Sequence, residues 1–194
     1  MARPREFDSR EALEKAMAVF WTEGYEAASL SDLIAAMGIS KSSFYDTYGS
    51  KHELLLSALD HYGETVGQRA AALILEHPDG PKAGIAAARN SVLDQRHNGG
   101  DRRGCLASNC AVELAPHDPE VAARVQQSAV RLEEAFFQAI RRGQDRGEIP
   151  KRADARALAR FLACSLNGLI VMAKSEAPPE AMEDAVRIAL STLD

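Results

Sequence analysis

Apolar residues recur along the chain at the spacing of an α-helix. Leu13, Ala16, Met17 and Phe20 stand at positions i, i+3, i+4 and i+7, which places them on one helix face. The same spacing recurs in five later stretches, at residues 30–37, 54–62, 121–140, 158–169 and 182–193. No stretch alternates apolar and polar residues as a half-buried strand does. The pattern predicts an all-α fold of about nine helices.

Capping residues divide the first part of the chain into two long and two short helices. An N-cap residue stands three positions before an acidic residue at Asp8, Ser29 and Ser50. Glycines that can end a helix follow at Gly24, Gly38 and Gly49. These signals predict helices over about 8–23, 30–37 and 41–48, and a longer one from 51 to about 76.

The two short helices have the size and spacing of a helix-turn-helix. Gly38 permits the sharp turn, Ile39 places an apolar side chain between the helices, and Ser40 can cap the second one. Phe44 is expected to face the core, which leaves hydroxyl side chains outward, a set suited to phosphates and base edges. Two short helices joined by a glycine turn also occur in proteins that never bind DNA, so shape alone does not decide.

Charge gives DNA binding only local support. The net charge is −5, and neither residues 1–52 nor residues 53–194 are basic overall. Lys41 and Lys51 bracket the second short helix, while Arg3 and Arg5 lie on a tail that can reach into an adjacent groove.

A resemblance to the TetR family of bacterial transcriptional regulators is carried by residues 20–59, FWTEGYEAASLSDLIAAMGISKSSFYDTYGSKHELLLSAL. The matching features keep the family's order and spacing, notably at 24–25, 38–41, 44–45 and 49–51. The resemblance implies a helix-turn-helix DNA-binding domain over 1–52 and an effector-binding and dimerisation domain over 53–194. Together with flanking residues, the candidate DNA-binding set is Arg3, Arg5, Ser29, Lys41, Ser42, Ser43, Tyr45, Thr47, Tyr48 and Lys51.

Asp46-Thr47-Tyr48 departs from the family's pattern, in which many members have two histidines and a phenylalanine. The departure bears on base preference. An aspartate in a recognition helix can accept from cytosine N4. It can instead orient a neighbouring lysine or tyrosine, and we favour this second role for Asp46.

The two C-terminal helices are the expected dimer surface, because their apolar faces and small residues suit a four-helix bundle across a two-fold axis. The expected interface residues are Phe161, Leu162, Leu166, Leu169, Val186, Ala189, Leu190 and Leu193. The alternative is that these side chains fill the core of a single chain. A homodimer places two recognition helices about 34–36 Å apart and predicts a palindromic operator in double-stranded DNA.

A reversible small-molecule inducer is the family's common solution for control, and the expected pocket residues are Cys105, Asn109, Glu113, Phe136, Phe137 and Asn167. Cys105 and Cys110 fall on one predicted helix. Cys105 lies near its start and near Arg102 and Arg103, conditions that favour a reactive thiolate and hence an oxidant or electrophile sensor. The alternative for each cysteine is a small buried apolar side chain.

Other classes of function lack the residues they require. The chain has no glycine-rich phosphate loop, nucleophile elbow or His-Glu-x-x-His motif, so no enzyme is expected. The cysteines, His97 and His117 lack metal-ligand spacing, and neither a metal nor another cofactor is expected. Scarce cysteines, a charged N-terminal start and no unbroken membrane-length apolar run indicate a cytoplasmic protein without membrane association. The sequence therefore predicts an inducer-released repressor. The alternative is the same regulator switched at Cys105, and a remoter one is a helical interaction module that does not bind DNA.

Overall fold

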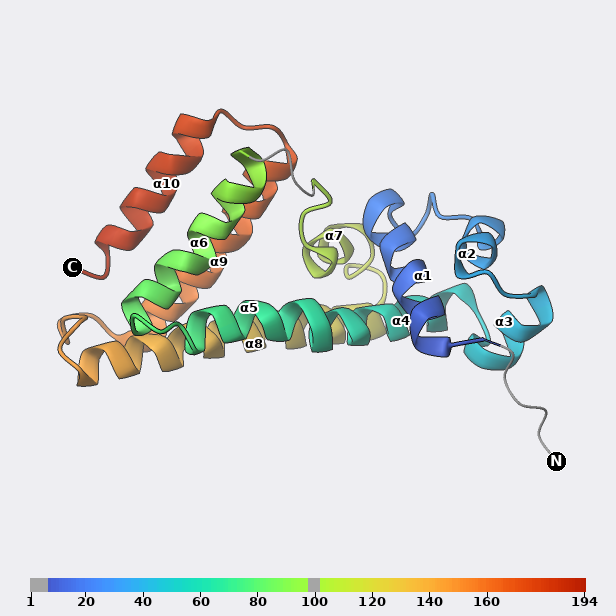
Figure 1. The fold of residues 1–194 in the computed structure, drawn as a ribbon, viewed down its shortest axis with the longest axis horizontal. Coiled ribbons are helices and arrows are strands. Elements are labelled where there is room, and N and C mark those ends of the chain that lie inside the picture. Colours follow the sequence, from blue (N-terminus) through green and yellow to red (C-terminus); the bar gives the residue numbers. More distant parts are fainter. Residues whose placement is uncertain (1–6, 98–101) are drawn as a thin grey trace. The chain divides into compact units, whose positions relative to one another are not determined.

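The computed structural model describes residues 7–97 and 102–194, and within them the chain is helical with no strand (Figure 1). The helices are α1 (Ser9–Glu23), α2 (Leu30–Met37), α3 (Lys41–Tyr48), α4 (Lys51–Tyr62), the π-helical turn η1 (Gly63–Gly67), α5 (Gln68–Leu75), α6 (Pro81–His97), α7 (Leu106–Glu113), α8 (Pro119–Asp145), α9 (Ala155–Lys174) and α10 (Pro179–Ser191). α4, η1 and α5 follow one another without interruption and form one helical run. Counted so, the described residues contain nine runs, and the all-α prediction is confirmed.

The chain forms two compact units, which do not follow the expected division after residue 52. The first unit comprises Met1–Glu64 with Leu106–Val125, and the second comprises Thr65–Cys105 with Gln126–Asp194. Thus α7 and the start of α8 pack with the N-terminal helices. Leu106, Cys110 and Val121 are buried in this part of the chain, and hydrogen bonds to residues far away in sequence add to the packing. Such distant partners leave no sign in hydrophobic periodicity.

The core of the first unit is built on α1, which packs against both α2 and α4. Ala12, Ala16 and Phe20 of α1 are buried at the predicted spacing. Phe44 of α3 and Leu54 of α4 are fully buried in the same unit. The short helices α2 and α3 are therefore held by burial of a few apolar residues, since helices of eight residues are marginal by themselves.

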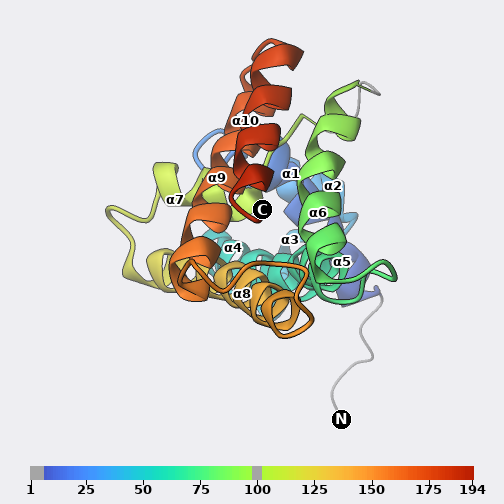
Figure 2. The same cartoon turned by 90° about the vertical axis from the view of Figure 1, so that its left-hand side faces the viewer.

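The core of the second unit lies among α6, α9 and α10, which pack against one another and lie side by side in Figure 2. Phe136 and Ile140 of α8, together with Ile85 of α6, belong to the same buried cluster. The cluster is continuous with residues of α9 and α10 that carry the apolar stripes seen in the sequence.

The expected dimer residues are largely core residues of one chain, which corrects the dimer surface predicted from sequence. Six of the eight are buried in the second unit's own core: Leu162, Leu166, Leu169, Val186, Ala189 and Leu193. Leu190 is half-buried against the same cluster, and only Phe161 is exposed, at 44%. Periodicity identified the apolar face of each helix correctly, but the neighbour that covers it is the chain itself.

α9 is long and apolar enough to cross a membrane by length and composition alone. The core helix of a water-soluble protein passes the same test, so this is weak evidence of membrane insertion. Arg160, Ser165 and Asn167 interrupt the apolar stretch, and Ala159 and Leu162 are fully buried in the second unit's core.

Candidate nucleic-acid interface

The turn between α2 and α3 has the geometry that the sequence predicts for a helix-turn-helix. Gly38 adopts the left-handed conformation, with φ 68° and ψ 32°, and its amide donates to the carbonyl groups of Ile34 and Ala35. The hydroxyl of Ser40 then caps α3 by accepting the amide of Ser43 at 3.1 Å. A side chain at position 38 would be strained in this conformation, which explains the glycine there.

α3 has one buried face and one exposed face. Phe44 is 0% exposed, whereas Tyr45 is 47% exposed and stands edge-on to the Phe44 ring at 5.3 Å. Lys41 and Ser42 are exposed on the outer side, and Thr47 is half-buried. The buried phenylalanine thus fixes which residues of α3 are presented to a partner, as expected from the sequence.

Three serine hydroxyls gather at the N-terminus of α3. Ser40 Oγ lies 2.9 Å from Ser42 Oγ and 2.9 Å from Ser43 Oγ. Lys41 lies between Ser40 and Ser42 in the sequence and is exposed. Hydroxyl groups, a lysine and the positive end of a helix together make a suitable site for a phosphate of the DNA backbone.

Two other expected DNA contacts have polar groups engaged within the protein. Ser29 is the N-cap of α2, and its hydroxyl donates to Asp32 Oδ2 at 2.5 Å. The Tyr48 hydroxyl donates to the backbone carbonyl of Ser9 at 3.0 Å, which ties the end of α3 to the start of α1. Arg3 and Arg5, on the tail before α1, lie outside the described residues.

Lys51 is held by an aromatic residue to which sequence reasoning assigned no role. Its ammonium group lies 4.4 Å from the centre of the Tyr25 ring, a cation–π distance. Burial, with the negative charges of Glu26 and Asp118, raises the pKa of Tyr25 above its ordinary value of 10. The Gly24-Tyr25 pair was visible in the resemblance, but only the structure shows that the ring positions Lys51.

Glu113, which the sequence analysis expects in an effector pocket, is hydrogen-bonded within the first unit. Its carboxylate accepts the amides of Tyr25 at 3.2 Å and Glu26 at 2.9 Å. Gly24, with φ 86°, lies so close that an added Cβ would stand 3.1 Å from the carboxylate. The end of α7 is therefore hydrogen-bonded to the turn that follows α1.

A second polar connection joins the start of α8 to α4. Asp118 caps α8 by accepting the amides of Glu120 and Val121, each at 3.0 Å, and its Oδ2 lies 2.7 Å from Nε2 of His52. The Val121 amide, followed by the hydrogen bond and charge of His52, holds the pKa of Asp118 below its usual value. One turn further along, Arg124 donates to Asp60 of α4 at 3.2 Å.

The expected effector residues are divided between the two units. Asn109 and Glu113 belong to the first, and Cys105, Phe136, Phe137 and Asn167 belong to the second. Phe136 is fully buried, and the Phe137 ring lies under the guanidinium of Arg156 at 3.7 Å.

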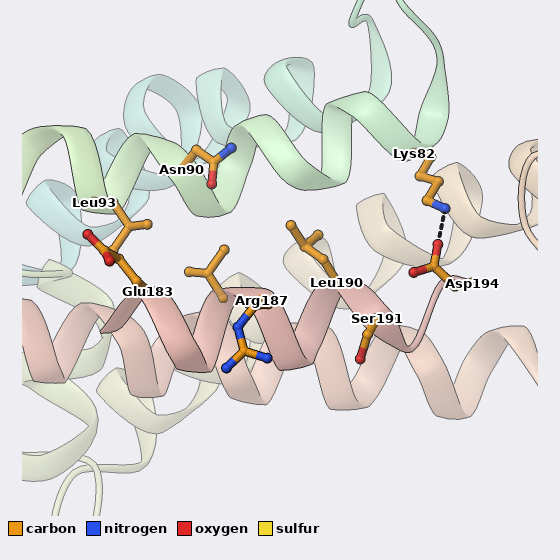
Figure 3. Close-up of a pocket in the computed structure, with 9 residues that line it drawn as sticks. Lys82, Asn90, Leu93, Glu183, Arg187, Leu190, Ser191 and Asp194 are labelled. Carbon is orange, nitrogen blue, oxygen red and sulfur yellow. Dashed lines mark hydrogen bonds and ion pairs between the residues drawn. The ribbon is translucent and has the colours of Figure 1, made fainter. Parts of the chain in front are cut away.

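A groove of about 510 Å³ lies between α6 and α10 (Figure 3). It is lined by Asn90 and Leu93 of α6 and by Arg187 and Leu190 of α10, with an ion pair of Lys82 and Asp194 at one end. None of the expected effector residues lines it.

The three cysteines occupy different environments and form no disulfide. Cys105 is half-buried and directly precedes the first residue of α7, so it does not lie on the same helix as Cys110, contrary to the sequence prediction. Cys110 is buried, whereas Cys164 is exposed on α9 and does not fit the buried alternative. Arg102 forms an ion pair with Glu176.

No group of three metal-binding side chains is found within residues 7–97 and 102–194. The side chain of His97 lies outside the described part of the chain.

Comparison with known families agrees with this arrangement of helices. Residues 6–58 match the family described as "Bacterial regulatory proteins, tetR family". Residues 81–189, more than half of the chain, match the "Tetracyclin repressor-like, C-terminal domain". The chain belongs to the TetR family.

Individual TetR-type relatives match along the whole chain. An uncharacterized HTH-type transcriptional regulator, YezE of Bacillus subtilis, is 38% identical, and the match covers 100% of both chains. The HTH-type transcriptional repressor ComR of Escherichia coli is 30% identical over 98% of this chain and 90% of its own. A cysteine-substituted variant of the TetR regulator CifR, complexed with 26-base-pair operator DNA, is 32% identical with a TM-score of 0.84 and full coverage of both chains. The protein is thus a DNA-binding transcriptional regulator of the TetR family.

The lowered pKa of Asp118 predicts a pH-dependent contribution to stability. A depressed carboxyl pKa stabilises the folded state above the unfolded-state value, near 3.8, and this stabilisation is lost as pH falls through the lower folded-state value. We expect Asp118→Asn to lower the urea midpoint at pH 7, and we expect its difference from the unsubstituted protein to shrink as the pH falls below 3.8.

The matched control is Asp46→Asn, an exposed aspartate of the same unit without a side-chain hydrogen bond among the described residues. It should leave the urea midpoint unchanged at each pH. A constant difference between Asp118→Asn and the unsubstituted protein from pH 7 to pH 3 would show that the Asp118 charge has no part in stability.

Proposed function

We propose that this protein is a homodimeric repressor that occupies a palindromic operator and is released from it by a small-molecule inducer. The helix-turn-helix of residues 1–52 would contact DNA, and residues 53–194 would supply dimerisation and effector binding. The protein would act in the cytoplasm. The observation that carries the proposal is the exposed face of α3, which presents Lys41, Ser42 and Tyr45 around a fully buried Phe44.

Each part of this face suits a different part of DNA. Lys41 and the serine hydroxyls at the start of α3 suit phosphate contacts, which set position and affinity. Tyr45 and Thr47 lie further along the helix, where base edges are read. Asp46 is exposed and, within the described residues, has no lysine or tyrosine partner to orient. This favours the other role weighed for it, acceptance of a hydrogen bond from cytosine N4.

A row of exposed residues on α9, which we call the α9 stripe, can form the dimer interface instead of the mostly buried residues predicted from the sequence. Phe161, Cys164, Gly168 and Val171 are all exposed and follow one another at intervals of three, four and three residues, which is the spacing of a helix–helix seam. An added Cβ on Gly168 would meet nothing within 4 Å, so a second helix can approach closely. On α10, Ile188 is also 55% exposed. A two-fold pairing of α9 and α10 would cover these side chains.

The DNA-binding proposal is tested by fluorescence anisotropy with DNA from upstream of the protein's own gene, across a series of salt concentrations. Affinity should fall steeply with salt and exceed that for random DNA. Lys41→Ala should weaken binding and reduce the slope of log affinity against log salt by about 1 per half-site. Lys151→Ala, which removes an exposed lysine of the second unit, is the control and should change neither.

An unchanged salt slope in Lys41→Ala would remove Lys41 from the phosphate contacts. If neither this DNA nor a genome-wide selection of bound fragments gave specific binding, the proposal would fail and the interaction-module alternative would replace it.

The dimer proposal predicts that a charge on the α9 stripe separates the subunits. Phe161→Glu should convert the protein to a monomer in sedimentation velocity, because the glutamate would be buried without a partner. Operator affinity should then fall by roughly 100-fold, because the two half-sites would no longer be bound by one linked pair. The control is Val130→Glu, which changes an apolar residue of α8 that is 57% exposed. A Phe161→Glu protein that remains dimeric would place the interface elsewhere.

Switching at Cys105 is the second candidate for control. Cys105 directly precedes α7, whose last residue is Glu113, the residue that holds the turn after α1. N-ethylmaleimide should release the unsubstituted protein and Cys164→Ser from the operator, but not Cys105→Ser. Release of Cys105→Ser to the same extent would exclude this mechanism and leave reversible inducer binding.

A further inference from the structure

The most unusual polar group in the second unit is the guanidinium of Arg89 on α6, which is 0% exposed. Its Nη2 donates to the backbone carbonyl of Leu162 at 3.0 Å, and its Nη1 donates to the Ser165 hydroxyl at 3.1 Å. Its Nε is buried and has no hydrogen-bond partner within the described chain. Both of its partners are neutral groups of α9.

The charge of Arg89 is uncompensated by the described residues. Burial alone lowers its pKa to about 10, so the side chain is still a cation near neutral pH. Within the described part of the chain Arg89 forms no ion pair, and both groups that accept its hydrogen bonds are neutral. An isolated buried charge is unfavourable, and buried charges are ordinarily paired or bound to a ligand.

Another arginine of the same unit shows how the chain treats a structural cation. Arg156 of α9 lies 3.2 Å from a carboxylate oxygen of Glu133 and 2.9 Å from one of Glu134, although it is partly exposed. Arg89 is more deeply buried and has neither. The counter-charge for Arg89 is therefore missing from the described chain itself.

We infer that Arg89 binds the carboxylate group of a small organic acid, which is the inducer class this regulator would sense. The unpartnered Nε and one Nη can donate in parallel to the two oxygens of a carboxylate, a pairing that a single lysine cannot reproduce. Ser165 supplies a neighbouring hydroxyl. The rest of the molecule would meet the buried apolar cluster, to which Ile85, one turn before Arg89 on α6, belongs. The inference rests on the proposed function, since it names the chemistry of the inducer.

Arg89 could instead be purely structural and link α6 to α9 through Leu162 and Ser165. The two roles predict opposite changes in the stability of one variant. Arg89→Met keeps an apolar side chain of similar length but removes the charge. If Arg89 serves an anion, the variant should be as stable as the unsubstituted protein or more stable when no organic acid is present. If Arg89 is structural, the variant should be less stable.

The binding test is thermal unfolding of the full chain with sodium acetate, propionate and benzoate. The corresponding neutral amides and sodium chloride at equal ionic strength are the comparison. A carboxylate at about 100 times its Kd should raise the midpoint by roughly 5–10 °C, whereas its amide should not. The shift should be lost in Arg89→Met, be reduced in Ser165→Ala, and persist in Arg187→Met, the control, whose exposed arginine pairs with Asp184 at 2.5 Å.

The inference is overturned if Arg89→Met unfolds at a lower temperature without added acid, or if none of the three carboxylates raises the midpoint more than its amide does. Operator binding without added acid tests the proposed function separately. If a carboxylate raised the unfolding midpoint in an Arg89-dependent way but the protein bound no DNA, the anion site would stand and the proposed regulator function would fail. If the protein bound its operator but no carboxylate raised the midpoint, the regulator function would stand and the anion site would fail.

Discussion

The carboxylate of Glu113 accepts the backbone amides of Tyr25 and Glu26, and these two hydrogen bonds tie α7 to the turn after α1. Gly24 leaves room for the Glu113 carboxylate and adopts a conformation that side chains disfavour. A larger residue at position 24 would therefore crowd the carboxylate and strain the turn. These hydrogen bonds and the pairing of His52 with Asp118 connect α7 and the start of α8 to the unit that carries the helix-turn-helix. A substitution at Gly24 would therefore disturb the connection even though position 24 contacts no DNA in the proposed complex.

In the same unit, three contacts fix the position of α3 and of the lysine that follows it. Phe44 is buried beneath α3, the Tyr48 hydroxyl ties the helix end to α1, and the Tyr25 ring positions Lys51 just beyond it. Such fixed presentation matters in an acidic protein. With a net charge of −5, general attraction to DNA is weak, and affinity must come from a few cations held where phosphates pass. A homodimer doubles those cations, which is a physical reason to expect paired subunits.

Local signals explain why so much of this architecture could be predicted from the sequence. Caps at Ser29 and Ser40, the left-handed Gly38 and the spacing of apolar residues act within one or two helical turns, so the helix-turn-helix was correctly placed. The failures involve partners far apart in the chain. Glu113 bonds a residue 88 positions away, which no periodicity reveals. The apolar stripes of α9 and α10 were found, but an apolar face does not state whether its own chain or a second copy will cover it. α9 in fact carries both kinds of face, since Leu162 and Leu166 are buried while Phe161 is exposed.

The chain passes between the two units at three points, and at two of them it is helical. One is α8, whose start is capped by Asp118 in the first unit and whose later residues Phe136 and Ile140 enter the core of the second. The other is α4 with α5, interrupted at the boundary by the π-helical turn Gly63–Gly67. Turns of this kind are less regular than the α-helix around them and often mark functional sites. A ligand can shift the protein between DNA-bound and released states only by binding one of them more tightly. A buried cation whose counter-charge arrives with the ligand supplies such a difference, because its pairing energy depends on how α6 and α9 are spaced around it.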